Sequence, residues 1–162
     1  MWTVTNSDDF DFLDTPAETA GDGSDWTVAV PLAIEAVRGE LLDWAAKTLR
    51  QRVPQAAAYP GNKGQVQCRL DLDRHLKQVL AVPLPSLAVH LTEYRAWALH
   101  AVWLPRGSPP ETLDAGAAVL AEALIRYVPA PAVARWAAQL TTSLGSSDSN
   151  AVRLIAQRCA TI

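Results

Sequence analysis

The chain of 162 residues has few of the features from which a reaction is usually read. Its two cysteines, Cys68 and Cys159, lie far apart without a CxxC pair or a neighbouring histidine. That spacing excludes a disulfide framework, and we expect two buried thiols in a reducing compartment. No serine lies in a GxSxG elbow, and the glycines around the turn at 60–64 lack the spacing of a phosphate loop. The sequence therefore indicates neither a nucleophilic enzyme nor a nucleotide site.

Long apolar runs are also missing. No window approaches the ~18 continuous apolar residues that a membrane-spanning helix requires. The first residues, 1–6, have neither the positive start nor the apolar core of a secretory signal, and the acidity that follows argues against a transit peptide. We expect no membrane partner and a cytoplasmic location.

Basic residues are absent from the first quarter of the chain. Before Arg38 there is no Lys or Arg, while eight acidic residues give this part a charge of −8. Residues 38–162 hold 14 basic and 9 acidic residues, a net charge of +5. Much of this excess lies between residues 47 and 77, where seven basic residues stand against two acidic ones. Such asymmetry is typical of a chain that contacts a charged partner or its own opposite end.

One short segment combines the negative charge with apolar side chains. It reads Asp8, Asp9, Phe10, Asp11, Phe12, Leu13, Asp14. Segments that only keep a protein soluble are poor in aromatic residues. Carboxylates alternating with aromatics are instead typical of segments that fold onto a groove with an apolar centre and a basic rim. We therefore predict that residues 8–14 bind a partner, in the same chain or in another protein.

Helical periodicity dominates the rest of the chain. Residues 1–25 are expected to form an acidic flexible tail, and residues 26–162 a single globular domain. Residues 26–30 could be a short strand or an extended lead-in, and Pro31 is suited to open a helix that ends before Pro54. A capping box at 108–111 predicts a helix to Tyr127. Two further helices are expected, at 131–144 and 150–159.

The middle of the chain is ambiguous. Apolar residues alternate strictly over 65–72, as Val66, Cys68, Leu70 and Leu72, which predicts a strand or hairpin there. Residues 73–104 fit either short strands or a helix capped by Ser86; their length and alanine content favour the helix. We predict a mainly α fold, a bundle of four to six helices with one short strand or hairpin near 65–72. The alternative is an α+β fold with a small meander at 65–104.

Two groups of residues could hold a metal ion or carry acid–base chemistry. If 86–103 is a helix, His90, Glu93, Trp97 and His100 share one face. However, ten residues separate the two histidines by about 15 Å along a helix, too far for one ion. A solvated helix face is the favoured interpretation, and no metal ion or other cofactor is predicted.

The second group is Asp71, Asp73 and His75, which alternate directly after the predicted strand. Carboxylates at strand ends can bind metal ions, but no further ligand completes a known loop. Two carboxylates at the start of a helix, where the dipole favours them, explain the pattern more simply.

The leading hypothesis is a non-enzymatic interaction protein, an adaptor or regulator, that binds another protein through Asp8–Asp14. The first alternative is a small metal-binding protein or enzyme that uses His90, Glu93 and His100, or Asp71, Asp73 and His75. The second alternative is a nucleic-acid-binding body regulated by the acidic tail. It is less favoured because the sequence pI is near 5.5, whereas nucleic-acid-binding domains commonly exceed ~9. No catalytic residue, oligomeric state or partner identity is predicted.

Overall fold

The computed structural model describes residues 20–57 and 60–145, with side chains from residue 28 onward. All regular elements in these ranges are helical, which confirms the predicted mainly α bundle. The α-helices are α2 (Ala20–Ala36), α3 (Arg38–Arg52), α4 (Gly61–Val79), α5 (Leu84–Ala98), α6 (Leu104–Arg106), α7 (Glu111–Tyr127) and α8 (Val133–Gln139). A 3-10 turn (Pro54–Ala56) follows α3, and π-helical turns (Leu99–Trp103 and Leu140–Leu144) join α5 to α6 and extend α8.

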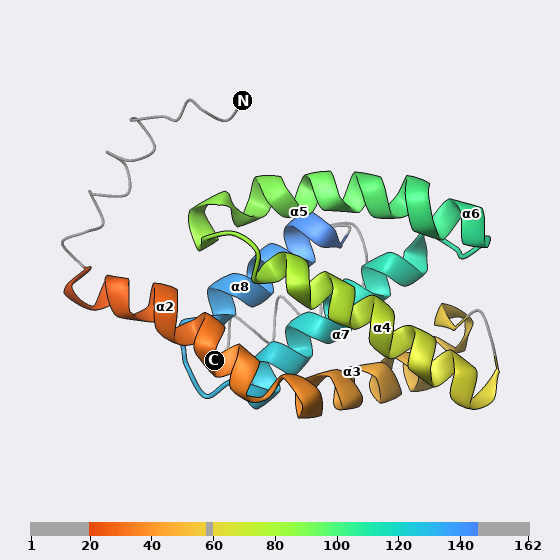
Figure 1. The fold of residues 1–162 in the computed structure, drawn as a ribbon, viewed down its shortest axis with the longest axis horizontal. Coiled ribbons are helices and arrows are strands. Elements are labelled where there is room, and N and C mark those ends of the chain that lie inside the picture. The colour runs from red at the N-terminus through yellow and green to blue at the C-terminus, as the bar shows by residue number, and fades with distance from the viewer. Residues whose placement is uncertain (1–19, 58–59, 146–162) are drawn as a thin grey trace.

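Helix α7 lies at the centre of the bundle. In Figure 1, α4 crosses in front of it, with α5 above and α3 below, and α8 lies behind. Most of the circumference of α7 is buried, and its buried residues are largely small, including Gly116, Ala117, Ala118 and Ala121. Small side chains let neighbouring helices approach closely on several sides, so the core forms around α7.

The N-terminal helices differ from the sequence prediction. Residues 26–30, expected as a strand or lead-in, belong to α2, which begins at Ala20 inside the range expected for the tail. Pro31 lies inside α2 rather than in its first turn. The single helix predicted as far as residue 52 is two helices, because the chain leaves helical geometry at Val37, with φ −114° and ψ 13°. The end of α3 at Arg52, ahead of Pro54, agrees with the prediction.

The predicted strand at 65–72 is wrong, since these residues form the middle of α4. Residues two apart on a helix point to nearly opposite sides, so alternation divides the apolar residues between two faces. Cys68 and Leu72 enter the core, each 1% exposed, while Val66 and Leu70 face outward, 51% and 55% exposed. The intervening Gln and Arg residues are strong helix formers, which favours a helix at 65–72. The strand prediction used periodicity alone and left this propensity out.

The helical interpretation of 86–103 is confirmed, and the meander at 65–104 is wrong. Helix α5 begins at Leu84, two residues before the predicted cap Ser86, because Pro83 and Pro85 fix the backbone of its first turn. Helix α7 ends at Tyr127 as predicted, but no side chain caps its start, so the capping box is wrong. The hydroxyl of Thr112 instead donates to the carbonyl oxygen of Pro109, at 2.7 Å.

The helix predicted at 131–144 is present as α8 and its π-helical extension, and Gly145 follows in an extended conformation. The helix predicted at 150–159 lies outside the described residues. None of the helices in the described ranges is long and apolar enough to cross a membrane.

Candidate functional site

The surface of α4 that points away from the core carries an unusual row of side chains. Five exposed residues follow one another at spacings of three and four, so they lie along one line of the helix. We call this row the α4 stripe: Lys63, Val66, Leu70, Arg74 and Lys77. Its centre is apolar and its two ends are basic. Such a surface suits an acidic peptide that also carries apolar side chains.

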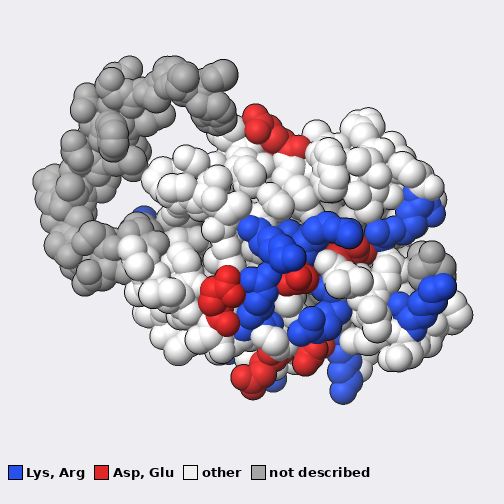
Figure 2. Space-filling model, in the orientation of Figure 1, with Lys and Arg blue, Asp and Glu red and all other residues white. Residues whose placement is uncertain are grey.

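Basic residues gather on the face of the molecule that α4 crosses. Figure 2 shows Lys and Arg in a band over this face, with Asp and Glu among them. Several cations of this band are held by carboxylates: Arg38 by Asp73 at 2.7 Å, and Arg69 by Asp43 at 2.6 Å. The stripe cations Arg74 and Lys77 are also paired, with Asp71 at 3.1 Å and with Asp73 at 3.6 Å, but 47% and 64% of their side chains stay accessible. The band is therefore a mixed-charge surface whose accessible cations border Val66 and Leu70.

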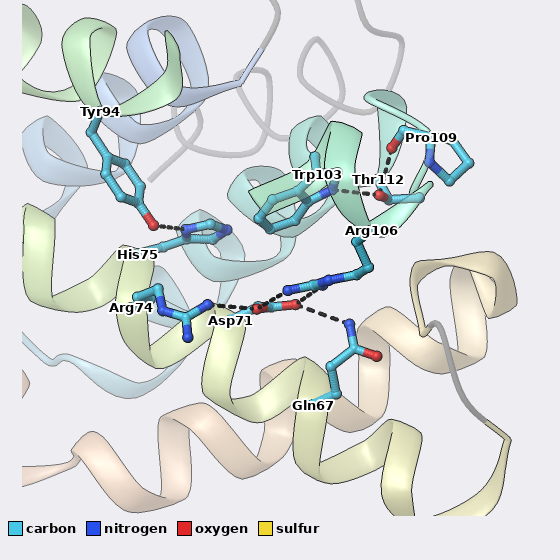
Figure 3. A network of polar contacts seen from close by, with 9 residues as sticks. All are labelled: Gln67, Asp71, Arg74, His75, Tyr94, Trp103, Arg106, Pro109 and Thr112. Atoms are coloured by element: carbon cyan, nitrogen blue, oxygen red, sulfur yellow. Dashed lines mark hydrogen bonds and ion pairs between the residues drawn. The ribbon is translucent and has the colours of Figure 1, made fainter. Parts of the chain in front are cut away.

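Beside the stripe, α4 turns a row of polar side chains toward α6 (Figure 3). Asp71 is the centre of this row. Its carboxylate accepts hydrogen bonds from Arg106 at 2.8 and 3.2 Å, from Arg74 at 3.1 Å and from Gln67 at 3.1 Å. Only 9% of the Asp71 side chain is exposed, so a carboxylate here depends on these donors for its stability.

His75, one turn further along α4, is almost fully buried, with 1% of its surface exposed. Its Nδ1 shares a hydrogen bond of 2.9 Å with the hydroxyl of Tyr94 on α5. Burial lowers the pKa of His75 from 6.5 to about 4, and burial raises the pKa of Tyr94 to about 12. Both groups are therefore neutral at physiological pH. The other side of the imidazole lies against Gly116, where an added Cβ would be 3.8 Å from Nε2.

Aromatic rings continue this network from the surface to Asp71. Trp97, 52% exposed, stacks on Tyr94, and Tyr94 meets His75 edge to face. His75 stacks on Trp103 with ring centroids 5.7 Å apart, and the guanidinium of Arg106 lies 5.1 Å from the centre of the Trp103 ring. The indole nitrogen of Trp103 also donates to Thr112 on α7 at 2.8 Å (Figure 3).

These contacts connect α4 to α5, to α6 and to the start of α7. The network therefore fixes the rotation of α4 about its own axis, and with it the direction in which the α4 stripe points. Arg74 belongs to both features, because it lies in the stripe and donates to Asp71. A neutral, buried histidine and a carboxylate with four hydrogen bonds are suited to this positioning role.

The two groups considered as metal sites are not assembled. Asp71 and His75 belong to the network, whereas Asp73 turns toward α3 and binds Arg38 and Lys77. His90 bonds to Gln78 at 2.8 Å, while Glu93 and His100 are exposed on α5 and its extension. Among residues 28–57 and 60–145, whose side chains the structure describes, no three His, Cys, Asp or Glu residues are placed to hold a metal ion.

The predicted binding segment Asp8–Asp14 lies outside the described residues, and its role stays a prediction. The α4 stripe was not predicted, although a signal for it existed. Val66 and Leu70 are four residues apart and flanked by cations at matching spacing, so a helical reading of 61–79 would have exposed the stripe.

Comparison with protein-family models, with curated proteins and with solved structures found no match for this chain.

Proposed function

We propose that the chain is a protein–protein interaction module, an adaptor or regulator, which binds through its acidic-aromatic segment Asp8–Asp14. The observation that carries the proposal is the composition of that segment, with four carboxylates and three large apolar side chains in seven residues. An apolar groove with a basic rim satisfies both kinds of side chain at once. The partner surface is therefore basic at its edges and apolar at its centre.

The folded body supports the proposal in two ways. The core around α7 is a packed scaffold that can hold a surface in a fixed orientation. The α4 stripe has the apolar centre and basic ends that the segment requires of a partner, so a segment and a matching kind of surface occur in one chain.

The test uses the full chain with substitutions inside the segment, because truncation at residue 25 would remove the first turns of α2. Wild-type protein and a Phe10→Ala/Phe12→Ala variant serve as baits in the native host, and captured proteins are identified by mass spectrometry. Thr3→Ala/Thr5→Ala is the matched control. We expect the wild type and the control to capture the same partner, and the Phe variant to lose it.

The identified partner is then purified and titrated with a peptide of residues 4–18, which should compete with the full chain. Equal capture by the wild type and the Phe variant contradicts the proposal. Salt-sensitive binding to DNA or RNA, gained when Asp8, Asp9, Asp11 and Asp14 are replaced with Asn, would instead support a nucleic-acid-binding body regulated by the charge of the tail.

A further inference from the structure

We infer that the α4 stripe is the docking surface for the acidic-aromatic segment Asp8–Asp14 of a second copy of this chain. This inference rests on the proposed function, since it gives the same segment a specific partner. Three observations carry it: the match between stripe and segment, the composition of the other residues outside the described ranges, and the position of α2.

The stripe and the segment are complementary in charge and in apolar surface. Val66 and Leu70 are more than half exposed and adjacent on α4, one turn apart. Lys63 lies before them, and Arg74 and Lys77 after them. The segment supplies two Phe and one Leu for the apolar centre and carboxylates on both sides for the cations. Desolvated apolar contacts would provide the affinity, and the charges would set the orientation.

The other residues outside the described ranges lack this complementarity. Residues 146–162 contain one acidic and two basic residues and no aromatic residue. A basic segment would be repelled by the cations of the stripe. Charge therefore selects the N-terminal segment over the C-terminal one.

The position of α2 favours a second copy over the segment's own chain. Six residue steps separate Asp14 from Ala20, the first residue of α2, and they span at most about 20 Å. Helix α2 begins at one end of the molecule, and α4 begins at the opposite end (Figure 1). Val66 and Leu70 lie in the first half of α4, nearer that opposite end, so the short linker favours the stripe of a neighbouring molecule over the stripe of its own chain.

The test combines two full-length variants that damage opposite halves of the contact. The segment variant is Phe10→Ser/Phe12→Ser, and the stripe variant is Val66→Ser/Leu70→Ser. Val89→Ser is the matched control, since Val89 is 55% exposed on α5. Masses are measured by sedimentation velocity over a concentration series, for each protein alone and for the two variants mixed in equal amounts.

We expect wild type and Val89→Ser to associate at high concentration, with weaker association at high salt. Each variant alone should associate at least about tenfold more weakly, because either change removes the apolar half of the contact. The mixture should recover a complex of one segment variant with one stripe variant, because each retains the half that the other lacks.

A wild type that remains monomeric at every concentration overturns the inference, as does a stripe variant that associates like the wild type. A segment variant that associates like the wild type overturns it too, because two stripes would then be pairing with each other. A mixture that forms no complex also overturns it, because an intact segment would then fail to bind an intact stripe. A monomeric wild type that still captures another protein through Phe10 and Phe12 leaves the proposed function standing. A wild type that neither associates with itself nor captures another protein through Phe10 and Phe12 contradicts both proposals.

Discussion

Replacing Asp71 with asparagine tests whether the network beside α4 holds this helix in place. The substitution keeps the shape of the side chain but removes its charge and turns one oxygen into a donor. Four hydrogen bonds from Arg106, Arg74 and Gln67 converge on the carboxylate. The nitrogen of the introduced amide cannot accept the bonds that reach its position, so donors would meet donors.

The expected loss of stability follows from the burial of the two main partners. Removing one partner of a fully buried ion pair lowers the free energy of unfolding by about 3–5 kcal/mol, because the other charge is left without its counterion. Here 9% of the Asp71 side chain and 21% of the Arg106 side chain are exposed. Partial solvation of Arg106 lowers the expected loss to about 2–3 kcal/mol.

Asp43→Asn is the matched control, because Asp43 also accepts from an arginine but its side chain is 71% exposed. A surface pair of this kind contributes about 0–1 kcal/mol. Thermal unfolding of both variants should therefore give a melting temperature about 5–10 °C lower for Asp71→Asn, and a change within about 3 °C for Asp43→Asn. If Asp71→Asn melts within about 1 °C of Asp43→Asn, the network does not hold α4.

Three further changes probe the same region. Acidification should destabilise the protein through His75, since the unfolded side chain takes up a proton near its ordinary pKa of 6.5 and the folded one only near 4. The free energy of unfolding has its full contribution from neutral His75 above pH 6.5 and loses about 3 kcal/mol of it as the pH falls toward 4. The unfolding free energy measured with urea should therefore depend less on pH in His75→Gln than in the wild type, and parallel curves would contradict this. Thr112→Val should lower the free energy of unfolding by about 1–2 kcal/mol, because the indole N–H of Trp103 loses its acceptor, whereas Thr112→Ser should stay near the wild type. Gly116→Ala should raise stability by about 0.5–1 kcal/mol, since its Cβ would meet Leu72 at 3.7 Å and His75 at 3.8 Å, both ordinary contacts; a lower melting temperature would show that α7 lacks the space.

The helices with a clear apolar stripe and proline boundaries could be predicted from the sequence. The ends of α3 at Arg52 and of α7 at Tyr127 follow from such patterns. The break at Val37 could not be predicted, because the apolar stripe continues across it. The break lies between residues that are all buried in the core, Val30 and Ile34 before it and Leu41 and Leu42 after it, so the turn of the chain at Val37 follows from tertiary packing that periodicity does not show.

The candidate site was harder to predict, because its parts come from separate helices. Asp71 and His75 were noticed for metal chemistry, but Arg106 and Trp103 lie about thirty residues further along the chain and reach them only through the turn from α5 into α6. No spacing rule connects these positions. Asp73 was grouped with Asp71 because residues two apart share a face of a strand. On a helix they face different sides, and Asp73 binds Arg38 instead.

The same alternation accounts for the α4 stripe and limits how strongly it can bind. A helix needs apolar residues only on its inner face, so Val66 and Leu70 are not required by the core that holds Cys68 and Leu72. Two side chains make a small patch, which by itself supports a weak and transient contact. Every copy of the chain carries both a segment and a stripe, so two molecules can exchange segments reciprocally. In such a pair the second contact forms within the complex at high effective concentration, and two weak contacts then give a stable association. Because both contacts must be intact, association should fall steeply when either half is damaged, and the mixture of the two variants, limited to one contact, should bind more weakly than the wild type.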